Sequence, residues 1–291
     1  MRMDNQDESR NVEDLRGAGG GYQFRPAHGI GLGTIVIALV GGWIFGINPL
    51  QLLGVLGGVG SDSTSSPRPS TALSAAQDAD KHFVSQVLRS TEVVWEHDFQ
   101  QLGRSYEDPT LTLFRDRSET ACGLGDAAAG PFYCPNDHHI YLDLGFFDLM
   151  TRQLGAPGQF AHAYVIAHEV GHHVQNLLGI LDREDASASR GEEAGASGHS
   201  VRTELQADCF AGVWAKRSQA EQGWRLEPGD IESALNAAAQ IGDDTLQRRS
   251  QGVVVPDTFT HGTSAQRVSW FKRGVDSGDP DQCDTFNANP L

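Results

Sequence analysis

Two histidines four residues apart, His168 and His172, place the tightest constraint on how this chain folds. They lie in an apolar stretch, residues 161–178, whose pattern predicts a helix. Side chains four residues apart share one helix face, so the two imidazoles can converge on a single tetrahedral ion. Glu169 lies beside them, where it can reach a metal-bound water rather than the metal. This His-Glu-x-x-His pattern is typical of zinc hydrolases, and it predicts a catalytic metal site.

A third zinc ligand is expected from Glu204, which follows His172 by 32 residues. A catalytic zinc has three protein ligands and one open position. If this stretch is helical, Asp208 shares a face with Glu204 and would hydrogen-bond the outer nitrogen of a ligand histidine, fixing its tautomer. Two carboxylates at this spacing repel each other, and a bound cation would relieve the repulsion. The alternative interpretation is an ordinary acidic surface pair.

Further along the chain, Thr263 and Gln266 predict a capping box at the start of a last helix. His261 and Arg267 flank this box, and either side chain could reach the zinc site and stabilise a developing oxyanion. Capping alone explains the segment about as well. His173 points about 100° away from His172, so we expect it to be structural or solvated.

An apolar segment near the N-terminus, residues 29–47, has no charged side chain. As a helix it would span roughly 30 Å, the thickness of a bilayer core. A secretory signal peptide would be shorter and would begin earlier, so we expect an uncleaved transmembrane helix over residues 28–47. Four arginines precede this segment and none follows it before Arg68. This asymmetry predicts a single-pass cell membrane protein with its N-terminus in the cytoplasm and its main domain outside.

The four cysteines are an even number, as expected for two disulfides in an oxidising compartment. Cys122 and Cys134 are close in sequence and flank a Gly/Ala-rich loop, which makes them the favoured pair. Cys209 and Cys283 would then form the second pair. Four cysteines allow three pairings, and buried free thiols are the alternative. No Cys-x-x-Cys pair occurs, which argues against a cysteine-based zinc site.

These segments divide the chain into four parts. We expect a cytoplasmic tail over residues 1–27, the transmembrane helix over 28–47, a stalk rich in Gly, Ser and Pro over 48–79, and one domain over 80–291. The formal net charge is −16. A surface this acidic repels phosphate backbones and makes nucleic acid a poor partner.

Within the domain, apolar spacing predicts a helix over residues 79–102. Alternating apolar and polar residues predict short strands at 111–114 and 140–144. The sequence after Pro157 is mainly helical in pattern, with a polar loop over 182–200. The expected fold class is therefore mainly α with a small β-sheet (α+β).

The chain resembles the bacterial putative neutral zinc metallopeptidase family over nearly its whole length. The matching stretches are residues 11–14, 122–135, 140–147, 163–179, 204–215, 261–274 and the ending around Cys283. The resemblance implies a zincin-like catalytic domain, one zinc ion and a peptide or protein substrate. The His-Glu-x-x-His and Glu-x-x-Ala-Asp pair also looks like membrane-associated zinc peptidases that use Glu as third ligand. In that group a Thr-His-Pro segment lies near the active site, and here Gly262 replaces the proline.

Together these observations predict a membrane-anchored zinc peptidase. Zinc would be held by His168, His172 and Glu204, and it would activate the water from which Glu169 takes a proton as general base. The alternative is an envelope binding protein with a structural metal site and no catalysis. Glu169 argues against that alternative, because a structural zinc site needs no spare carboxylate.

Overall fold

The computed structural model describes residues 1–2, 7–16, 75–127, 130–182 and 194–291. The predicted transmembrane helix over residues 28–47, and most of the predicted stalk and polar loop, lie outside these ranges. None of the helices in the described ranges combines the length and the apolar character needed to cross a membrane. The described part is mainly helical with small sheets, which confirms the α+β class.

The larger sheet has four strands in the order β1-β2-β6-β5. Its strands are β1 (Val12–Asp14), β2 (Thr110–Phe114), β6 (His139–Asp143) and β5 (Phe132–Cys134). β2 is parallel to both of its neighbours, whereas β5 is antiparallel to β6. The strands predicted at 111–114 and 140–144 are therefore confirmed. A separate hairpin joins β3 (Arg117–Thr120) to β4 (Gly123–Asp126).

Alternate residues of the two central strands face opposite sides of the sheet, as the pleat requires. On one side they join the main core under the helices, and these residues are Leu111, Leu113, Ile140 and Leu142. On the other side Phe114 and Tyr141 form a smaller cluster with Cys134. Both faces of the sheet are thus covered, which explains why the central strands are buried.

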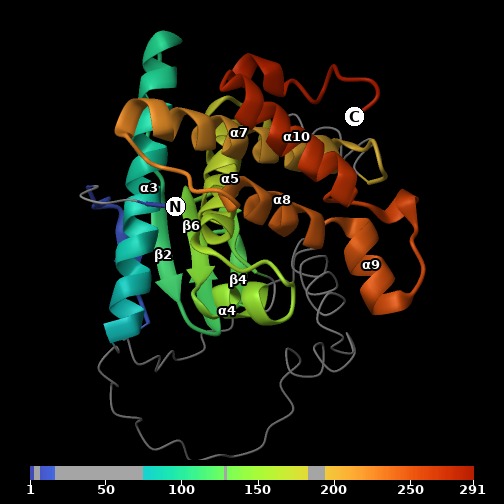
Figure 1. Cartoon of the computed structure of the whole chain (residues 1–291), viewed down its shortest axis with the longest axis horizontal. Coiled ribbons are helices and arrows are strands. Elements are labelled where there is room, and N and C mark those ends of the chain that lie inside the picture. The colour runs from blue at the N-terminus through green and yellow to red at the C-terminus, as the bar shows by residue number, and fades with distance from the viewer. Residues whose placement is uncertain (3–6, 17–74, 128–129, 183–193) are drawn as a thin grey trace, which may run out of the picture.

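Helices supply the rest of the core. They are α3 (Ala75–Gln101), α4 (Gly145–Arg152), α5 (Gln159–Leu177), α7 (His199–Gln222), α8 (Asp230–Gln240), α9 (Asp243–Gln251) and α10 (Ser264–Ser277), with short 3-10 turns η2 (Pro256–Thr258) and η3 (Pro280–Cys283). Figure 1 shows β2 and β6 between α3 and α5, with α7 crossing the upper end of α5, and α5 contacts α3, α7 and α8. The helical pattern predicted after Pro157 is confirmed. The first helix begins at residue 75, four residues before the predicted start.

Helices α7 and α10 approach until their backbones touch. A Cβ atom on Gly274 would collide with the carbonyl oxygen of Cys209, and one on Gly212 would collide with that of Phe271. Glycine is required at both positions for this packing. The predicted disulfides are both present: Cys122–Cys134, and Cys209–Cys283, which ties α7 to η3 beyond α10. Residues far apart in sequence are thereby fixed beside the central helices.

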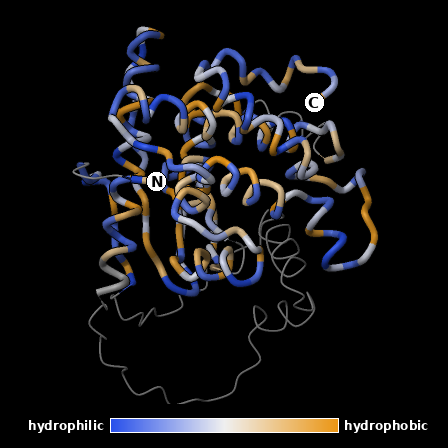
Figure 2. The backbone as a smooth tube through the Cα atoms, viewed as in Figure 1, coloured by the Kyte–Doolittle hydropathy of each residue, from blue (hydrophilic) through white to orange (hydrophobic). Residues whose placement is uncertain are grey.

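Hydropathy follows this arrangement. Figure 2 shows hydrophobic positions gathered along the central helices and strands, while α9 at the periphery is almost wholly hydrophilic. The loop after α9 is hydrophobic, and Val253 there is 61% exposed. The core thus sits around α5 and α7, the two helices that carry the predicted zinc ligands.

The N-terminal residues give a result that the sequence did not predict. Residues 12–14, expected in a separate cytoplasmic tail, form β1 and pair with β2 in the same sheet as the rest of the domain. No short-range pattern predicts this pairing. β1 has only three residues, and its partner β2 lies about a hundred residues further along the chain.

Candidate metal centre

The predicted ligands His168, His172 and Glu204 come together at the crossing of α5 and α7. One ligand atom from each residue lies within 4.8 Å of the other two. The Nε2 atom of His168 is 3.2 Å from Glu204 Oε2, and the Nε2 atom of His172 is 3.5 Å from Glu204 Oε1. Both imidazoles therefore turn the same nitrogen towards the carboxylate. Two imidazole nitrogens and one carboxylate are a donor set that suits zinc.

Gly171 makes this crossing possible. It lies between the two ligand histidines, and a Cβ atom there would be 3.0 Å from both the Cα and the carbonyl oxygen of Ala207. The hydrogen side chain lets α5 and α7 approach closely enough for Glu204 to reach both rings. The motif thus supplies two of the predicted ligands and also sets the distance between α5 and α7.

The outer nitrogen of His168 is held by charged groups. Its Nδ1 is 2.9 Å from Asp208 Oδ1, the contact predicted for this residue. Asp208 is fully buried, and it also accepts a hydrogen bond from the hydroxyl of Tyr164 at 2.5 Å. With Nδ1 carrying the proton, the Nε2 lone pair is free to bind a metal. Tyr164 lies four residues before His168 on the same helix face, a signal that could have identified it.

Arg267 completes the charged side. It donates from Nε to Asp208 Oδ2 at 2.8 Å and from Nη2 to Oδ1 at 2.9 Å. The sequence suggested that Arg267 could stabilise an oxyanion, but the side chain is 2% exposed and lies on the outer, Nδ1 side of His168. The guanidinium balances the buried charge of Asp208, and its Nη2 also lies 3.9 Å from Glu204 Oε2, so the oxyanion role suggested from the sequence stays a prediction.

The electrostatics of this cluster follow from burial and carboxylates. Burial alone lowers the pKa of His168, but Asp208 and Glu204 outweigh it and raise that pKa to about 10. Burial raises the pKa of Glu204, yet the neighbouring histidines, His172 first, hold it well below its usual range. The centre is thus an anionic pocket that favours a cation.

The outer nitrogen of His172 is held by neutral groups that the sequence did not identify. Its Nδ1 donates to Gln175 Oε1 at 2.9 Å. Gln175 Nε2 in turn donates to Thr203 O at 2.7 Å and to Gln206 Oε1 at 3.1 Å. Gln206 Nε2 donates to the carbonyl oxygen of Cys283 at 3.0 Å. Gln175 follows His172 by three residues on the same helix face, so its contact with His172 could be predicted from the sequence. The contact of Gln206 with Gln175 depends on the packing of α7 against α5 and could not.

Glu169 is buried beside the ligands, with 7% of its surface exposed. Burial raises its pKa, while the positive charge of His168 and His172 opposes that rise. His173, the adjacent histidine, is fully buried with Nδ1 near the Tyr133 hydroxyl and Nε2 near the Glu107 carbonyl oxygen. It therefore has the structural role that its direction on the helix predicted.

His261 lies on the loop before α10 and is oriented by Asp243, another residue that sequence reasoning missed. Asp243 Oδ2 accepts hydrogen bonds from the backbone nitrogens of Thr260, His261 and Gly262 at 2.7 to 3.0 Å. Its Oδ1 is 3.3 Å from His261 Nδ1. Burial lowers the pKa of His261, but Glu204 and Asp243 raise it overall. His261 is thus within electrostatic reach of the predicted ligand set. The predicted capping box of Thr263 and Gln266 is present next to it.

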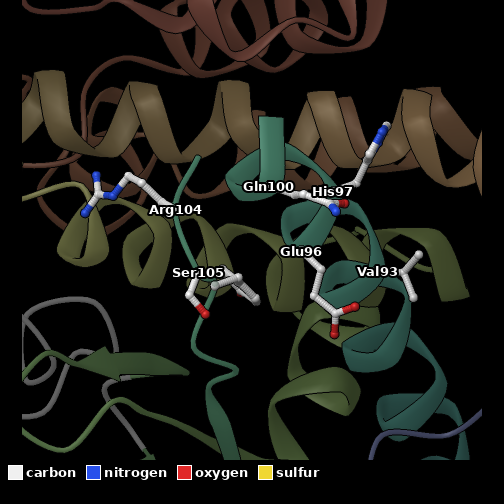
Figure 3. Close-up of a pocket in the computed structure, with 7 residues that line it drawn as sticks. Val93, Glu96, His97, Gln100, Arg104 and Ser105 are labelled. Atoms are coloured by element: carbon white, nitrogen blue, oxygen red, sulfur yellow. The ribbon is translucent and has the colours of Figure 1, made fainter. Parts of the chain in front are cut away.

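A separate surface pocket of about 420 Å³ lies at the C-terminal end of α3. Figure 3 shows Glu96 and Ser105 on its wall, together with Arg104. None of the predicted site residues lines this pocket. The candidate metal ligands therefore lie at the crossing of α5 and α7, away from this pocket.

Comparisons with known proteins give a consistent result. The family model described as "Putative neutral zinc metallopeptidase" matches residues 1–286. The uncharacterized protein YpfJ of Escherichia coli is 48% identical over 292 residues, covering 98% of this chain and 99% of its own. The uncharacterized protein Rv2575 of Mycobacterium tuberculosis is 46% identical over 211 residues, which is 69% of each chain. No solved structure matches the chain.

Proposed function

Because the chain belongs to the neutral zinc metallopeptidase family, we propose that it hydrolyses peptide bonds with one zinc ion held by His168, His172 and Glu204. One observation carries the proposal. The Nε2 atoms of both histidines and the carboxylate of Glu204 face one another, while each Nδ1 is engaged elsewhere. This is the arrangement that ligands of a single ion require.

The number of ligand groups supports a catalytic site over a structural one. Among the described residues, the cluster comprises three side chains that can bind the ion. Structural zinc sites have four protein ligands, whereas catalytic sites keep one position for water or substrate. The buried Glu169 beside this cluster supports the same choice, because a structural site has no use for it. The envelope binding protein considered from the sequence gains no comparable support.

When bound, zinc polarises the scissile carbonyl and makes a water molecule more acidic. Glu169 takes the proton that the attacking water loses and passes it to the nitrogen of the leaving amine. His261, oriented by Asp243, donates a hydrogen bond to the oxygen on which negative charge develops. Asp208 and Gln175 keep the two ligand rings in the tautomer that binds metal. Arg267 balances the charge of Asp208 and takes no part in proton transfer.

The location of the protein forms part of the proposal. Two disulfides support an oxidising compartment outside the cytoplasm for the domain. The membrane segment predicted over residues 28–47 lies outside the described residues and stays a prediction.

The roles of Glu169 and Glu204 separate in one experiment on the purified protein. We expect Glu169→Gln to keep one zinc per chain and to lose peptidase activity by a factor of at least about a hundred. Glu204→Ala should lose the zinc itself, since one of three ligands is gone. Metal analysis and cleavage of a peptide library, with and without chelator, provide the two measurements. Full turnover by zinc-loaded Glu169→Gln would refute the general-base role, and stoichiometric zinc in Glu204→Ala would refute the ligand set.

A further inference from the structure

The segment formed by residues 7–16 is joined to the outer edge of the sheet by backbone hydrogen bonds. β1 pairs with β2 in parallel, from Val12 opposite Leu111 to Asp14 opposite Leu113. The bonds at both ends of the pairing, from Leu111 N to Asn11 O and from Leu15 N to Leu113 O, are 2.8 Å long. Figure 1 shows this segment, in dark blue, running beside α3. The sheet edge and the segment therefore form one structural unit.

A buried carboxylate on α3 receives the start of the segment. Glu92 is 1% exposed. Its Oε1 accepts hydrogen bonds from Ser9 Oγ at 2.5 Å and from Asn11 Nδ2 at 3.0 Å, and Arg89 Nη1 contacts its Oε2 at 2.9 Å. Ser9 and Ser85 add two more bonds, one from each residue to the other's carbonyl oxygen. Without the segment, Glu92 Oε1 would lose Ser9 and Asn11, and a buried carboxylate oxygen that loses its donors is unfavourable even though Arg89 still contacts Oε2. Helix α3 therefore favours the docked segment.

The end of the segment is held by an ion-pair cluster. Arg16 contacts Asp14 at 2.7 and 2.8 Å, and Lys81 on α3 lies 3.4 Å from the same carboxylate. Arg16 is 9% exposed although it carries a charge. Both ends of the segment are thus fixed to α3, and its middle is fixed to β2. The contacts involve side chains as well as backbone. This indicates a docking surface specific for this segment rather than non-specific pairing with an exposed strand edge.

We infer that residues 7–16 and the metal-binding domain occupy the same compartment. Hydrogen bonds of this length need direct contact, and no bilayer can lie between the two strands that share them. A single membrane crossing over residues 28–47, as predicted from the sequence, would put residues 1–27 in the cytoplasm and the domain outside, and would therefore separate β1 from β2. It would also leave Glu92 without Ser9 and Asn11. The inference is independent of the proposed peptidase activity.

Cysteine accessibility tests this inference in the full chain. Glu8 is 52% exposed and Lys272 on α10 is 59% exposed, so Glu8→Cys and Lys272→Cys each present one free thiol for labelling. The four natural cysteines are in disulfides and do not compete. A membrane-impermeant maleimide is applied to spheroplasts before and after lysis. Same-side location predicts that both variants label under the same condition, whether before lysis or only after it. Labelling of Lys272→Cys before lysis and of Glu8→Cys only after lysis would overturn the inference.

A cross-link tests the docked state itself. Glu13 and Thr112 are Cα partners across β1 and β2, so the double variant Glu13→Cys, Thr112→Cys should form a disulfide on mild oxidation in cells. The expected result is a faster-migrating monomer on a non-reducing gel that disappears on reduction. Glu13→Cys alone is the control. Absence of the cross-link in a chain that is folded by circular dichroism would show that β1 is not docked, and would count against the shared compartment.

Discussion

The two proposed ligand histidines are held by different kinds of groups on the two sides of the candidate metal centre. Behind His168 lies a charged group, Asp208, balanced by Arg267 and bonded by Tyr164. Behind His172 lies a neutral chain of amides, Gln175 and then Gln206, which ends on a backbone carbonyl at the disulfide. Both sides present an acceptor to Nδ1, so both rings offer the same nitrogen to the ion. The same task, orienting the ring, is performed by a charged carboxylate behind His168 and by amide dipoles behind His172.

This difference reflects how much negative charge a buried centre tolerates. Glu204 and Glu169 already bring two carboxylates, and Asp208 adds a third that needs Arg267 as a counter-ion. A fourth carboxylate behind His172 would need another buried cation. Amides orient the ring without that cost, although they raise its basicity less than a carboxylate does. We therefore expect the charged side to dominate zinc affinity and the neutral side to refine it.

The largest effect should come from Asp208→Asn. The amide can still accept a hydrogen bond from His168, but the variant loses the negative charge. The buried Arg267 then loses its directly hydrogen-bonded carboxylate and keeps the more distant Glu204, 3.9 Å away. We expect zinc affinity to fall about 10- to 100-fold and the free energy of unfolding to fall by about 3–5 kcal/mol. Competition with a chelating dye and urea unfolding measure the two quantities.

The double variant Asp208→Asn, Arg267→Gln is the control for that experiment. Removing the stranded cation should restore much of the stability without restoring zinc affinity. If both variants bound zinc as tightly as the natural chain, the charged side would have no part in metal binding. The expected difference in zinc affinity between the charged and the neutral side would then be wrong.

A smaller effect is expected from Gln175→Leu on the neutral side. The change removes the acceptor of His172 Nδ1 and the donor to Gln206, at similar side-chain volume. We expect zinc affinity to fall about tenfold and the free energy of unfolding to fall by about 1–3 kcal/mol. Gln206→Leu is the matched control, because it leaves the bond between His172 and Gln175 intact and should weaken zinc binding less. A Gln206→Leu variant that lost as much zinc affinity as Asp208→Asn would contradict the expectation that the charged side dominates zinc affinity.

The two sides also differ in how many of their residues can be predicted from the sequence. Asp208 could be predicted because it shares a helix face with Glu204, and a helix face is a local property. Arg267 was noticed, but its partner could not be identified, since the contact between α10 and α7 depends on glycine contacts that only the fold reveals. The role of Gln206 could not be predicted either, because its partner Cys283 is 77 residues further along the chain.

The same limit applies to the N-terminal segment and to His261. β1 is three residues long, and its pairing with β2 follows from side chains on α3 rather than from any alternation in its own sequence. The loop that carries His261 is ordered by Asp243, 18 residues earlier at the start of α9, where an acidic residue would ordinarily serve only the helix terminus. Short-range patterns therefore predict the candidate ligands, whereas long-range packing decides which residues hold them.

The smallest effect concerns His162, another histidine of α5, whose hydrogen bond is to the backbone of Phe147 rather than to a carboxylate or an amide side chain. Its ring stacks on Phe147 at 4.1 Å between centroids, and Nε2 has no hydrogen-bond partner in the described part of the chain. Burial lowers its pKa from 6.5 to about 4, whereas carboxylates raise that of His168 to about 10. The unfolded chain thus binds a proton at a higher pH than the folded chain does. The stability contributed by neutral His162 is complete above about pH 6.5 and is lost as the pH falls towards 4.

At about pH 5 this loss should be about 1 kcal/mol, after a reduction for the partial exposure of the ring. His162→Phe keeps the stacking on Phe147 and removes the titration. Urea unfolding of both proteins in chelator, at neutral and at acidic pH, isolates the contribution, because all other titrating groups are shared. The natural chain should lose more stability on acidification than the variant does. An equal loss in both would mean that burial does not lower the pKa of His162, and the contrast with the pKa of His168 would not hold.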